Sequence, residues 1–210
     1  MSKQILVDYI PFEVSRKMIN ESIKENNGRL VVSGVLQRAD AKNQNGRVYP
    51  KDTLVREAKK YAKVQIKERR ALGELDHPDS SVVNLNNVSH NILEMHWKGD
   101  DLVGTVEVLG TPAGNILKEL FKSGIKLGIS SRGLGSVEEM NEGDDDDPTV
   151  KVQPDFELIA FDFVSNPSTH GAFLSPTNEG KLNESVGTRQ GVCCHDCKIE
   201  ELINDIFRGE

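Results

Sequence analysis

Gly128-Ile129-Ser130-Ser131-Arg132-Gly133-Leu134-Gly135 is the stretch from which the rest of this sequence can be interpreted. Its glycines permit tight turns and leave amide N–H groups free to face a ligand. Its adjacent serines offer hydroxyl groups, which become nucleophiles when a base lies beside them. A short strand is expected immediately before the serines, over residues 125–129. Taken alone, a Gly/Ser-rich segment is more often an ordinary loop than a nucleophile site.

A second segment, Gly73-Glu74-Leu75-Asp76-His77-Pro78, supplies a candidate base upstream of the serines. Histidine titrates near neutrality, so His77 can accept a proton from a hydroxyl group. A histidine before a proline also occurs simply as part of a turn. The flanking Glu74 and Asp76 are expected either to be solvated or to orient the imidazole, and the sequence leaves both alternatives open. Together the two segments indicate acyl-transfer chemistry of the serine hydrolase type.

Length and charge exclude several classes of protein. With 210 residues, the chain is long enough for one sizeable domain with tails, whose core needs no metal or disulfide. Its formal net charge of -7 disfavours binding to a polyanion such as DNA. It has no apolar run near the roughly twenty residues of a membrane span, and its start lacks the apolar core of a signal peptide. We therefore expect a soluble intracellular protein that binds neither nucleic acid nor membrane.

The three cysteines, Cys193, Cys194 and Cys197, lie too close together for a disulfide framework that spans a fold. Cys194-His195-Asp196-Cys197 has the spacing of half a zinc site, but a closed site needs about four ligands and no second pair exists elsewhere. Cys193 and His195 would have to complete a cramped set, or two chains would have to share the metal. We expect reduced cysteines in a tail, and neither a metal nor a cofactor.

Hydrophobic periodicity predicts a chain of alternating strands and helices. Strands are expected over residues 5–12, 30–36 and 156–164, and a hairpin over residues 91–108. Helices are expected over residues 13–25, 50–66, 111–124 and, in the tail, 198–207. Residues 138–148 include a run of aspartates, which repel one another, so an exposed flexible loop is expected there.

Asp162 lies within the predicted strand over residues 156–164, where Ile159, Phe161 and Phe163 form one face. A carboxylate among apolar neighbours in a core strand is costly unless a charged or donating group satisfies it, and a histidine would do so. The alternative is an exposed edge strand with Asp162 in water. Periodicity alone favours neither alternative.

Four segments resemble, in the same order, the prohead core maturation proteases of large contractile-tailed bacteriophages, a family related to the herpesvirus assemblins. The segments are Asn45-Gly46-Arg47-Val48-Tyr49-Pro50, Ala71-Leu72-Gly73-Glu74-Leu75-Asp76-His77-Pro78, Trp97-Lys98-Gly99-Asp100 and Gly128-Ile129-Ser130-Ser131-Arg132-Gly133-Leu134-Gly135-Ser136. The match covers roughly residues 30–174. It implies an α+β fold of the assemblin type, a mainly antiparallel β-barrel surrounded by helices. We expect an N-terminal segment (1–28), a protease domain (29–175) and a linker with a tail (176–210), both ends being candidates for removal.

The resemblance also implies a catalytic triad. His77 matches the family's catalytic histidine, Ser130 matches its nucleophile, and Asp162 lies where the wider phage family has an acidic third member. Assemblins use a second histidine in the third role, for which the candidates are His90, His96 and His170.

The tetrahedral intermediate of amide hydrolysis carries a negative oxygen that needs fixed donors. The candidates are the backbone N–H groups of Ser131, Arg132 and Gly133, with the Arg132 guanidinium nearby. Chemistry alone also leaves Ser131 open as the nucleophile, whereas the resemblance favours Ser130.

The family cleaves after glutamate in an apolar-x-Glu pattern, and two matches lie outside the resembling part of the chain: Ile19-Asn20-Glu21-Ser22 and Leu182-Asn183-Glu184-Ser185. We expect self-processing at Glu21 and Glu184. The same pattern also occurs inside predicted folded segments, where the chain cannot enter an active site. The resemblance further implies phage scaffold or core proteins and the major capsid protein as substrates, in the host cytoplasm inside the assembling prohead. It leaves homo-oligomer formation open.

Two other classes of function fit the sequence less well. A catalytically inactive capsid-assembly scaffold module would retain the fold and bind partners through the tail helix. A different serine hydrolase, such as an esterase, would be expected to centre a Gly-x-Ser-x-Gly elbow on its nucleophile, and neither Ser130 nor Ser131 has one.

Overall fold

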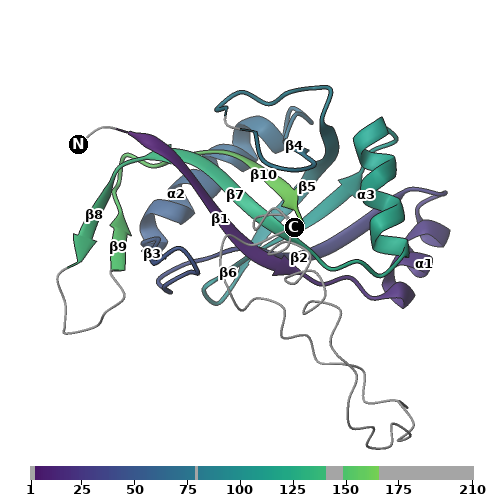
Figure 1. The fold of residues 1–210 in the computed structure, drawn as a ribbon, viewed down its shortest axis with the longest axis horizontal. Coiled ribbons are helices and arrows are strands. Elements are labelled where there is room, and N and C mark those ends of the chain that lie inside the picture. The colour runs from purple at the N-terminus through teal and green to yellow at the C-terminus, as the bar shows by residue number, and fades with distance from the viewer. Residues whose placement is uncertain (1–2, 79, 141–148, 166–210) are drawn as a thin grey trace, which may run out of the picture. The chain divides into compact units, whose positions relative to one another are not determined.

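The computed structural model describes residues 3–78, 80–140 and 149–165, which form a strand-rich α+β fold (Figure 1). The α+β part of the predicted fold class is therefore confirmed. The strands are β1 (Gln4–Phe12), β2 (Leu30–Arg38), β3 (Arg47–Val48), β4 (Leu72–Glu74), β5 (Val88–Lys98), β6 (Asp101–Val108), β7 (Leu127–Gly135), β8 (Val137–Met140), β9 (Thr149–Val152) and β10 (Glu157–Val164). The helices are α1 (Arg16–Glu25), α2 (Lys51–Tyr61), which continues as a short π-helix (Ala62–Ile66), and α3 (Pro112–Lys122).

The described strands form three sheets, with the orders β1-β7-β10, β2-β6-β5-β4 and β3-β9-β8. Neighbouring strands within the sheets run antiparallel, except that β3 and β9 are parallel. The first two sheets are joined just after β4, where Leu75 pairs with Phe163 of β10 and the Asp76 N–H donates to the Phe163 carbonyl (2.8 Å). No ladder in the described ranges joins β1 to β2, so closure of these sheets into a barrel stays a prediction.

The Gly/Ser-rich stretch is a strand rather than a loop. The strand predicted over residues 125–129 begins at Leu127 and continues to Gly135, with β1 on one side and β10 on the other. Glycine is needed at position 128 because the Tyr9 ring lies where a Cβ would be. Packing between two flanking strands, and not local propensity, therefore determines this element.

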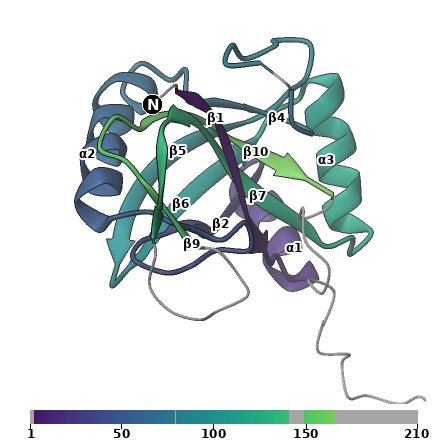
Figure 2. The ribbon, with the colours of Figure 1, turned by 60° about the vertical axis from the view of Figure 1, so that its left-hand side comes forward.

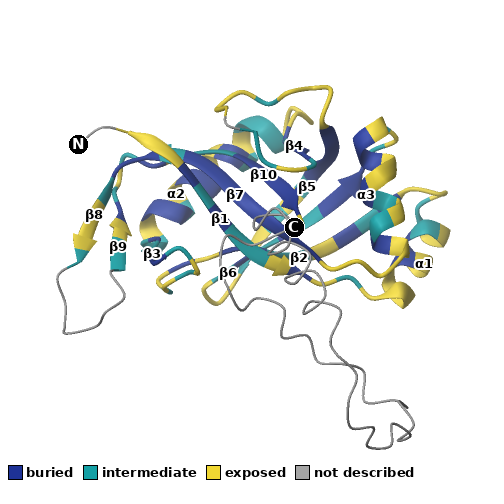
Figure 3. Cartoon of the chain, in the orientation of Figure 1, coloured by how far each residue is buried: buried dark blue, intermediate teal, exposed yellow. Residues whose placement is uncertain are grey.

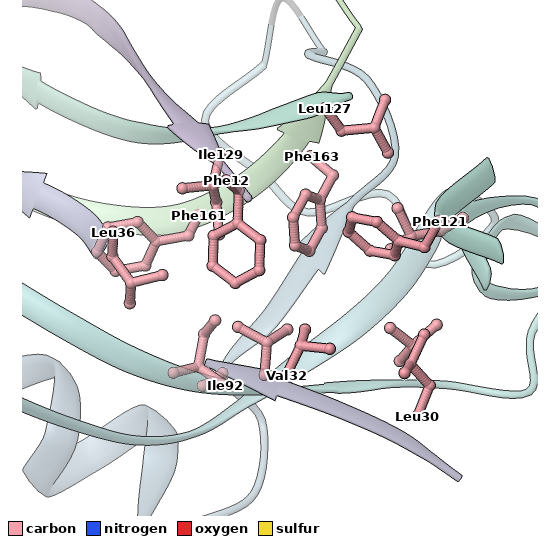
Figure 4. Close-up of a cluster of buried hydrophobic side chains, with 14 of the residues drawn as sticks. Phe12, Leu30, Val32, Leu36, Ile92, Phe121, Leu127, Ile129, Phe161 and Phe163 are labelled. Carbon is pink, nitrogen blue, oxygen red and sulfur yellow. The ribbon is translucent and has the colours of Figure 1, made fainter. Parts of the chain in front are cut away.

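The main hydrophobic core lies between the β1-β7-β10 and β2-β6-β5-β4 sheets (Figure 4). Near its centre, the Phe163 ring contacts the rings of Phe12 and Phe121 edge-on, with centroid distances of 5.1 and 5.4 Å. Figure 3 shows that β7 is buried along most of its length. Because side chains alternate along a strand, Ile129 enters this core while Ser130 lies on the opposite face of β7.

The helices lie on two sides of the strands, with α2 on one side and α1 and α3 on the other (Figure 2). α1 begins at Arg16 and not at Glu13, because the Ser15 side chain caps it by accepting the Met18 N–H (3.2 Å). α3 begins after its capping residue Thr111, as the sequence predicted. No helix in the described part of the chain is long and apolar enough to cross a membrane.

The N-terminal segment is part of the folded unit. β1 pairs with β7 from Gln4 to Phe12, and its side chains Leu6 and Phe12 are buried. Ile19 of α1 is buried in the same cluster as Phe12. The segment predicted to be removable therefore supplies both a strand and core residues.

The first residues of the exposed loop predicted over residues 138–148 instead belong to β8, because Val137–Met140 pair with β9. The aspartate run lies outside the described residues. So do the linker and tail, with the helix predicted over residues 198–207.

Replacing Gly73 by alanine tests the junction between β4 and β10. A Cβ at this position would overlap the Phe161 carbonyl oxygen and the His90 ring, which are both buried. We expect Gly73→Ala to lower the free energy of unfolding by about 3 kcal/mol, because overpacking here strains the backbone. Urea unfolding measures this change. The control is Gly110→Ala, whose Cβ would have no neighbour within 4 Å, and equal stability of the two variants would contradict the prediction.

Candidate active site

Ser130 and Asp162 lie opposite each other on neighbouring strands. Antiparallel pairing places Ser130 of β7 across from Asp162 of β10, and residues that pair in this way share one face of the sheet. His77 reaches the same face from the segment after β4, which pairs with β10. The chain turns at Asp76, whose φ of 72° lies in the left-handed region that aspartate tolerates better than most residues. Three segments far apart in the sequence thus converge on one site.

The three side chains make consecutive polar contacts. His77 Nε2 lies 2.7 Å from Ser130 Oγ, and His77 Nδ1 lies 3.2 Å from Asp162 Oδ2. The second contact has an ion-pair distance, but His77 Nδ1 has no hydrogen-bond partner in the described part of the chain. Ser130 and Asp162 are fully buried, whereas 21% of the His77 side chain is exposed. The imidazole is therefore placed to exchange a proton with Ser130, and a small rotation would complete its bond to Asp162.

Donors from several elements hold the Asp162 carboxylate. Arg132 binds it side-on, with Nε 2.8 Å from Oδ2 and Nη2 3.2 Å from Oδ1, and the Glu74 backbone N–H donates to Oδ1 (2.9 Å). Burial raises the pKa of the Asp162 carboxyl, but the contact with His77, the Arg132 charge and the Glu74 N–H together lower the pKa below its ordinary value. Of the two alternatives that the sequence left open for Asp162, the structure shows the buried and satisfied one, and the solvated edge-strand carboxylate is wrong.

The three residues after Ser130 have other partners for their side chains. Ser131 lies on the inner face of β7, where its hydroxyl accepts a hydrogen bond from Gln37 Nε2 (2.8 Å). The Arg132 guanidinium is directed at buried carboxylates, and Gly133 packs against the Phe156 ring. An oxyanion hole at these residues stays a prediction, and its donors would have to be their backbone N–H groups.

His90, one of the three histidines considered for the third position of the triad, has hydrogen-bond partners other than His77. His90 is fully buried, with Nδ1 2.9 Å from Ser89 Oγ and Nε2 2.9 Å from the Phe161 carbonyl. Burial lowers the pKa of His90 to about 4. His96 is exposed on β5, and His170 lies outside the described residues.

Glu74 is the residue of this site whose role the sequence left open. Its side chain is fully buried, so the solvated alternative is wrong for Glu74. Its Oε1 accepts hydrogen bonds from Arg132 Nη2 (3.0 Å) and from the Asn84 N–H (3.0 Å). Asp76, in contrast, is exposed and accepts the His77 N–H (2.9 Å). β4 has only three residues, too few for periodicity to show which side chain is buried.

No group of three or more His, Cys, Asp or Glu side chains in residues 3–78, 80–140 and 149–165 is arranged to hold a metal ion. The cysteine-rich alternative, Cys193, Cys194, His195 and Cys197, lies outside these ranges. The zinc-site alternative in the tail therefore stays open.

Comparisons with known proteins agree with one another. A family model described as prohead core protein serine protease matches residues 4–184. The chain is 35% identical over 150 residues to the prohead core protein protease of Enterobacteria phage T4, in an alignment that covers 70% of this chain and 68% of that protein. It is also similar to the solved structure of the bacteriophage T4 capsid assembly protease gp21, with a TM-score of 0.67 and 27% identity, covering 79% of this chain and 99% of that one. The resemblance inferred from the four segments is confirmed.

Asp162→Asn tests the electrostatic role of the buried carboxylate. Because its pKa in the folded protein lies below the ordinary value of 3.8, the charged group stabilises the fold above that pH. This contribution disappears as the pH falls through the lowered pKa. We expect the variant to lose about 3 kcal/mol of unfolding free energy at about pH 7, where Arg132 loses one of its two buried carboxylate partners, and less toward about pH 3.

Urea unfolding at both pH values measures this difference. The control is Asp101→Asn at the partly exposed pair with Arg38, which is expected to cost no more than about 1 kcal/mol. A loss in Asp162→Asn that does not depend on pH would contradict the charge-based explanation.

Proposed function

The chain belongs to the prohead core protein serine protease family, and on this basis we propose a serine endopeptidase of phage capsid maturation whose catalytic triad is His77, Ser130 and Asp162. The observation that carries the proposal is the 2.7 Å contact between His77 Nε2 and Ser130 Oγ, beside a buried carboxylate. A hydroxyl, a base and an orienting group in this arrangement are typical of an activated serine. The order of the three residues along the chain is unusual, but triads are defined by geometry.

In the proposed mechanism, neutral His77 accepts the Ser130 proton as Oγ attacks the carbonyl carbon of the substrate peptide bond. The imidazolium then protonates the leaving amine, while the acyl group stays on Ser130. A water molecule, deprotonated by His77, attacks this acyl enzyme and regenerates the serine. Asp162 stabilises the imidazolium in both steps and fixes the proton of neutral His77 on Nδ1.

The proposed oxyanion donors are backbone N–H groups of the segment from Ser131 to Gly133. In a regular central strand these groups would be used by the ladders on either side. The pairing of β10 with β7 is irregular between Leu158 and Ala160, which lie opposite Gly133 and Arg132. Such a bulge leaves a backbone group outside the ladder and re-aims its neighbours, and bulges are over-represented beside active sites. The extra residue of this bulge, Ile159, lies on β10, so the bulge interrupts the ladder beside Arg132 and Gly133 without itself freeing an N–H group of β7, and the oxyanion hole remains a proposal.

The proposed substrates are phage scaffold or core proteins and the major capsid protein, cleaved after glutamate in apolar-x-Glu segments. One relative is by name a prohead core protein protease, and the other is by title a capsid assembly protease. These names support action inside the assembling prohead, in the host cytoplasm.

The alternative function is a catalytically inactive capsid-assembly module with the same fold. A module that only binds partners has no need for a histidine within hydrogen-bonding distance of a buried serine. It also has no need for a carboxylate buried beside that histidine, because an unneeded buried charge is costly. The geometry therefore favours the protease.

A peptide of residues 178–190, which contains Leu182-Asn183-Glu184, is a suitable substrate for testing the triad. We expect Ser130→Ala to lower its cleavage rate by at least about 10⁴-fold, because the nucleophile is lost. The control, Ser131→Ala, should keep most of the activity and cost about 1 kcal/mol of stability, since this hydroxyl contacts Gln37 on the other face. Loss of activity in Ser131→Ala alone would reassign the nucleophile. A parent protein that cleaves neither this peptide nor a prohead scaffold protein would favour the inactive module.

Self-processing at Glu21, which we also propose, would cut inside folded structure. Glu21 lies in α1, and the next residue, Ser22, is buried. The Ser22 hydroxyl accepts the Val31 N–H (2.8 Å) and donates to the Val31 carbonyl (2.6 Å). α1 therefore has to open locally before this segment can enter an active site in extended form. The second proposed site, Glu184, lies outside the described residues.

If Glu21 is cut, we expect the fragment of residues 1–21 to remain bound, because β1 stays paired with β7 and keeps Leu6 and Phe12 buried. The fragment should then appear by denaturing mass spectrometry in the peak that elutes as intact protein from a native size-exclusion column. Glu21→Gln is the control and should yield no fragment. A fragment that separates from the body would contradict the prediction. Full-length masses for both the parent and Ser130→Ala, differing only by the oxygen atom that the substitution removes, would exclude self-processing at both sites.

A further inference from the structure

A second carboxylate is buried behind the triad. Glu74, Arg132 and Asp162 are each fully buried. Arg132 Nη2 lies 3.0 Å from Glu74 Oε1 and 3.2 Å from Asp162 Oδ1, while Arg132 Nε lies 2.8 Å from Asp162 Oδ2. Arg132 Nη1 donates to the Ser80 carbonyl (2.6 Å). The Arg132 guanidinium is thus shared between two carboxylates. Asp162, the carboxylate beside His77, therefore shares this cation with Glu74.

The ionisable groups around the Asp162 carboxylate come from every element packed against it. They are His77 and Asp76 after β4, Glu74 of β4, Arg132 of β7, Tyr61 of α2 and His90 of β5. Burial raises the pKa of Tyr61 and lowers the pKa of His90 to about 4, so neither carries charge near neutral pH. Asp76 is exposed to solvent, which screens it. The buried charges are therefore one guanidinium and two carboxylates, beside an imidazole that gains and loses a proton.

We propose that Glu74 is a positioning residue whose negative charge offsets Arg132, so that the Asp162 carboxylate remains available to stabilise the His77 imidazolium. With His77 neutral, the buried cluster has one negative charge in excess. When His77 takes the serine proton, the cluster becomes neutral, which favours the proton transfer in a site of low dielectric. Without Glu74, the Arg132 charge would be balanced by Asp162 alone.

The hydrogen bonds of Glu74 do not explain why a charge is present. A glutamine side-chain oxygen in the same place would accept from both Arg132 and Asn84, as Glu74 Oε1 does. The second oxygen, Glu74 Oε2, is buried and has no hydrogen-bond partner in the described part of the chain. An unsatisfied buried oxygen costs stability, and the amide nitrogen of a glutamine would be as unsatisfied in its place, so hydrogen bonding does not decide between the two side chains. What glutamate supplies, and glutamine does not, is the negative charge.

The inference rests on the proposed function, and its test does not require activity. In full-length Ser130→Ala protein, the ring signals of His77 are followed by NMR as a function of pH. We expect Glu74→Gln in this background to lower the midpoint of the His77 titration by about 0.5–1 pH unit, a three- to tenfold weaker affinity for the proton. Glu74→Asp, which keeps the charge, should stay within about 0.3 unit of the parent midpoint.

The matched control is Glu107→Gln on β6. Glu107 is also buried and paired with arginines, Arg29 and Arg69, but does not contact Arg132. It should leave the His77 midpoint unchanged although it also removes a buried carboxylate, and it should cost less stability because Arg29 and Arg69 are largely exposed. A Glu74→Gln variant that is destabilised but keeps the parent midpoint would overturn the inference, because Glu74 would then be purely structural.

Two further measurements keep the inference testable if Glu74→Gln does not fold. Glu74→Met, which is neutral and similar in shape, should give the same lowered midpoint. In protein with Glu74 unaltered, its ¹³C carboxyl signal should be that of a carboxylate between about pH 6 and 8, and a carboxylic acid signal there would overturn the inference.

In the active protein, the acid limb of the pH profile for cleavage of the 178–190 peptide should move to lower pH in Glu74→Gln. kcat should fall by about tenfold with KM nearly unchanged, because Glu74 acts through Asp162 and does not touch the substrate. A shifted NMR midpoint in a protein that cleaves nothing would refute the proposed function and leave the electrostatic role of Glu74 intact. Cleavage of the peptide with an unshifted His77 midpoint would support the proposed function and refute the electrostatic role of Glu74.

Discussion

The side-on ion pair between Arg132 and Asp162 is the interaction on which the candidate site depends. Both side chains are fully buried, and each would be costly to bury without the other. They come from neighbouring strands, so the ion pair also favours the observed register of β10 against β7. A slip by one residue would turn Asp162 toward the aromatic core and take from Arg132 one of its two carboxylate partners. The same contact therefore supports both the strand pairing and the electrostatics beside His77.

β7 joins the hydrophobic core to the chemistry through the alternation of its side chains. Ile129 is buried in the core between the sheets, and Ser131 faces the same side, where Gln37 binds it. Ser130 and Arg132 face the opposite side, toward His77 and the carboxylates. Because β1 and β10 flank β7, the serine lies on a rigid central strand and not on a flexible loop. This accounts for how the Ser130 hydroxyl, the proposed nucleophile, can be held 2.7 Å from the His77 imidazole before any substrate is bound.

The position of β1 constrains any maturation of the N-terminus. The sequence suggests a domain boundary near residue 28, because the segments that resemble the protease family begin after that residue. In the fold, however, β1 is the neighbour of the strand that bears Ser130, with Tyr9 in register with that residue. Loss of β1 would expose the edge of β7 and remove Leu6 and Phe12 from the core. Processing at Glu21 is therefore compatible with this fold only when the cut strand stays in place.

The sequence by itself determined what depends on local chemistry and local periodicity. The strand of β1, the hairpin of β5 and β6, and helix α3 followed from their hydrophobic patterns, and the conjunction of His77 with the two serines indicated the reaction class. Asp162 was identified as a candidate because a carboxylate in an apolar strand requires a partner. The family resemblance then supplied the fold, which these patterns did not.

Only the tertiary structure decided which residues meet. It converted the Gly/Ser-rich stretch from an expected loop into β7, because two flanking strands and the Tyr9 ring outweigh the weak strand propensity of glycine. It buried Glu74, whose three-residue strand has no readable pattern, and gave Arg132 two carboxylate partners from β4 and β10. Burial and partnership depend on contacts between segments distant in the chain. Side-chain identity tells which chemistry is available, and long-range packing determines where it is assembled.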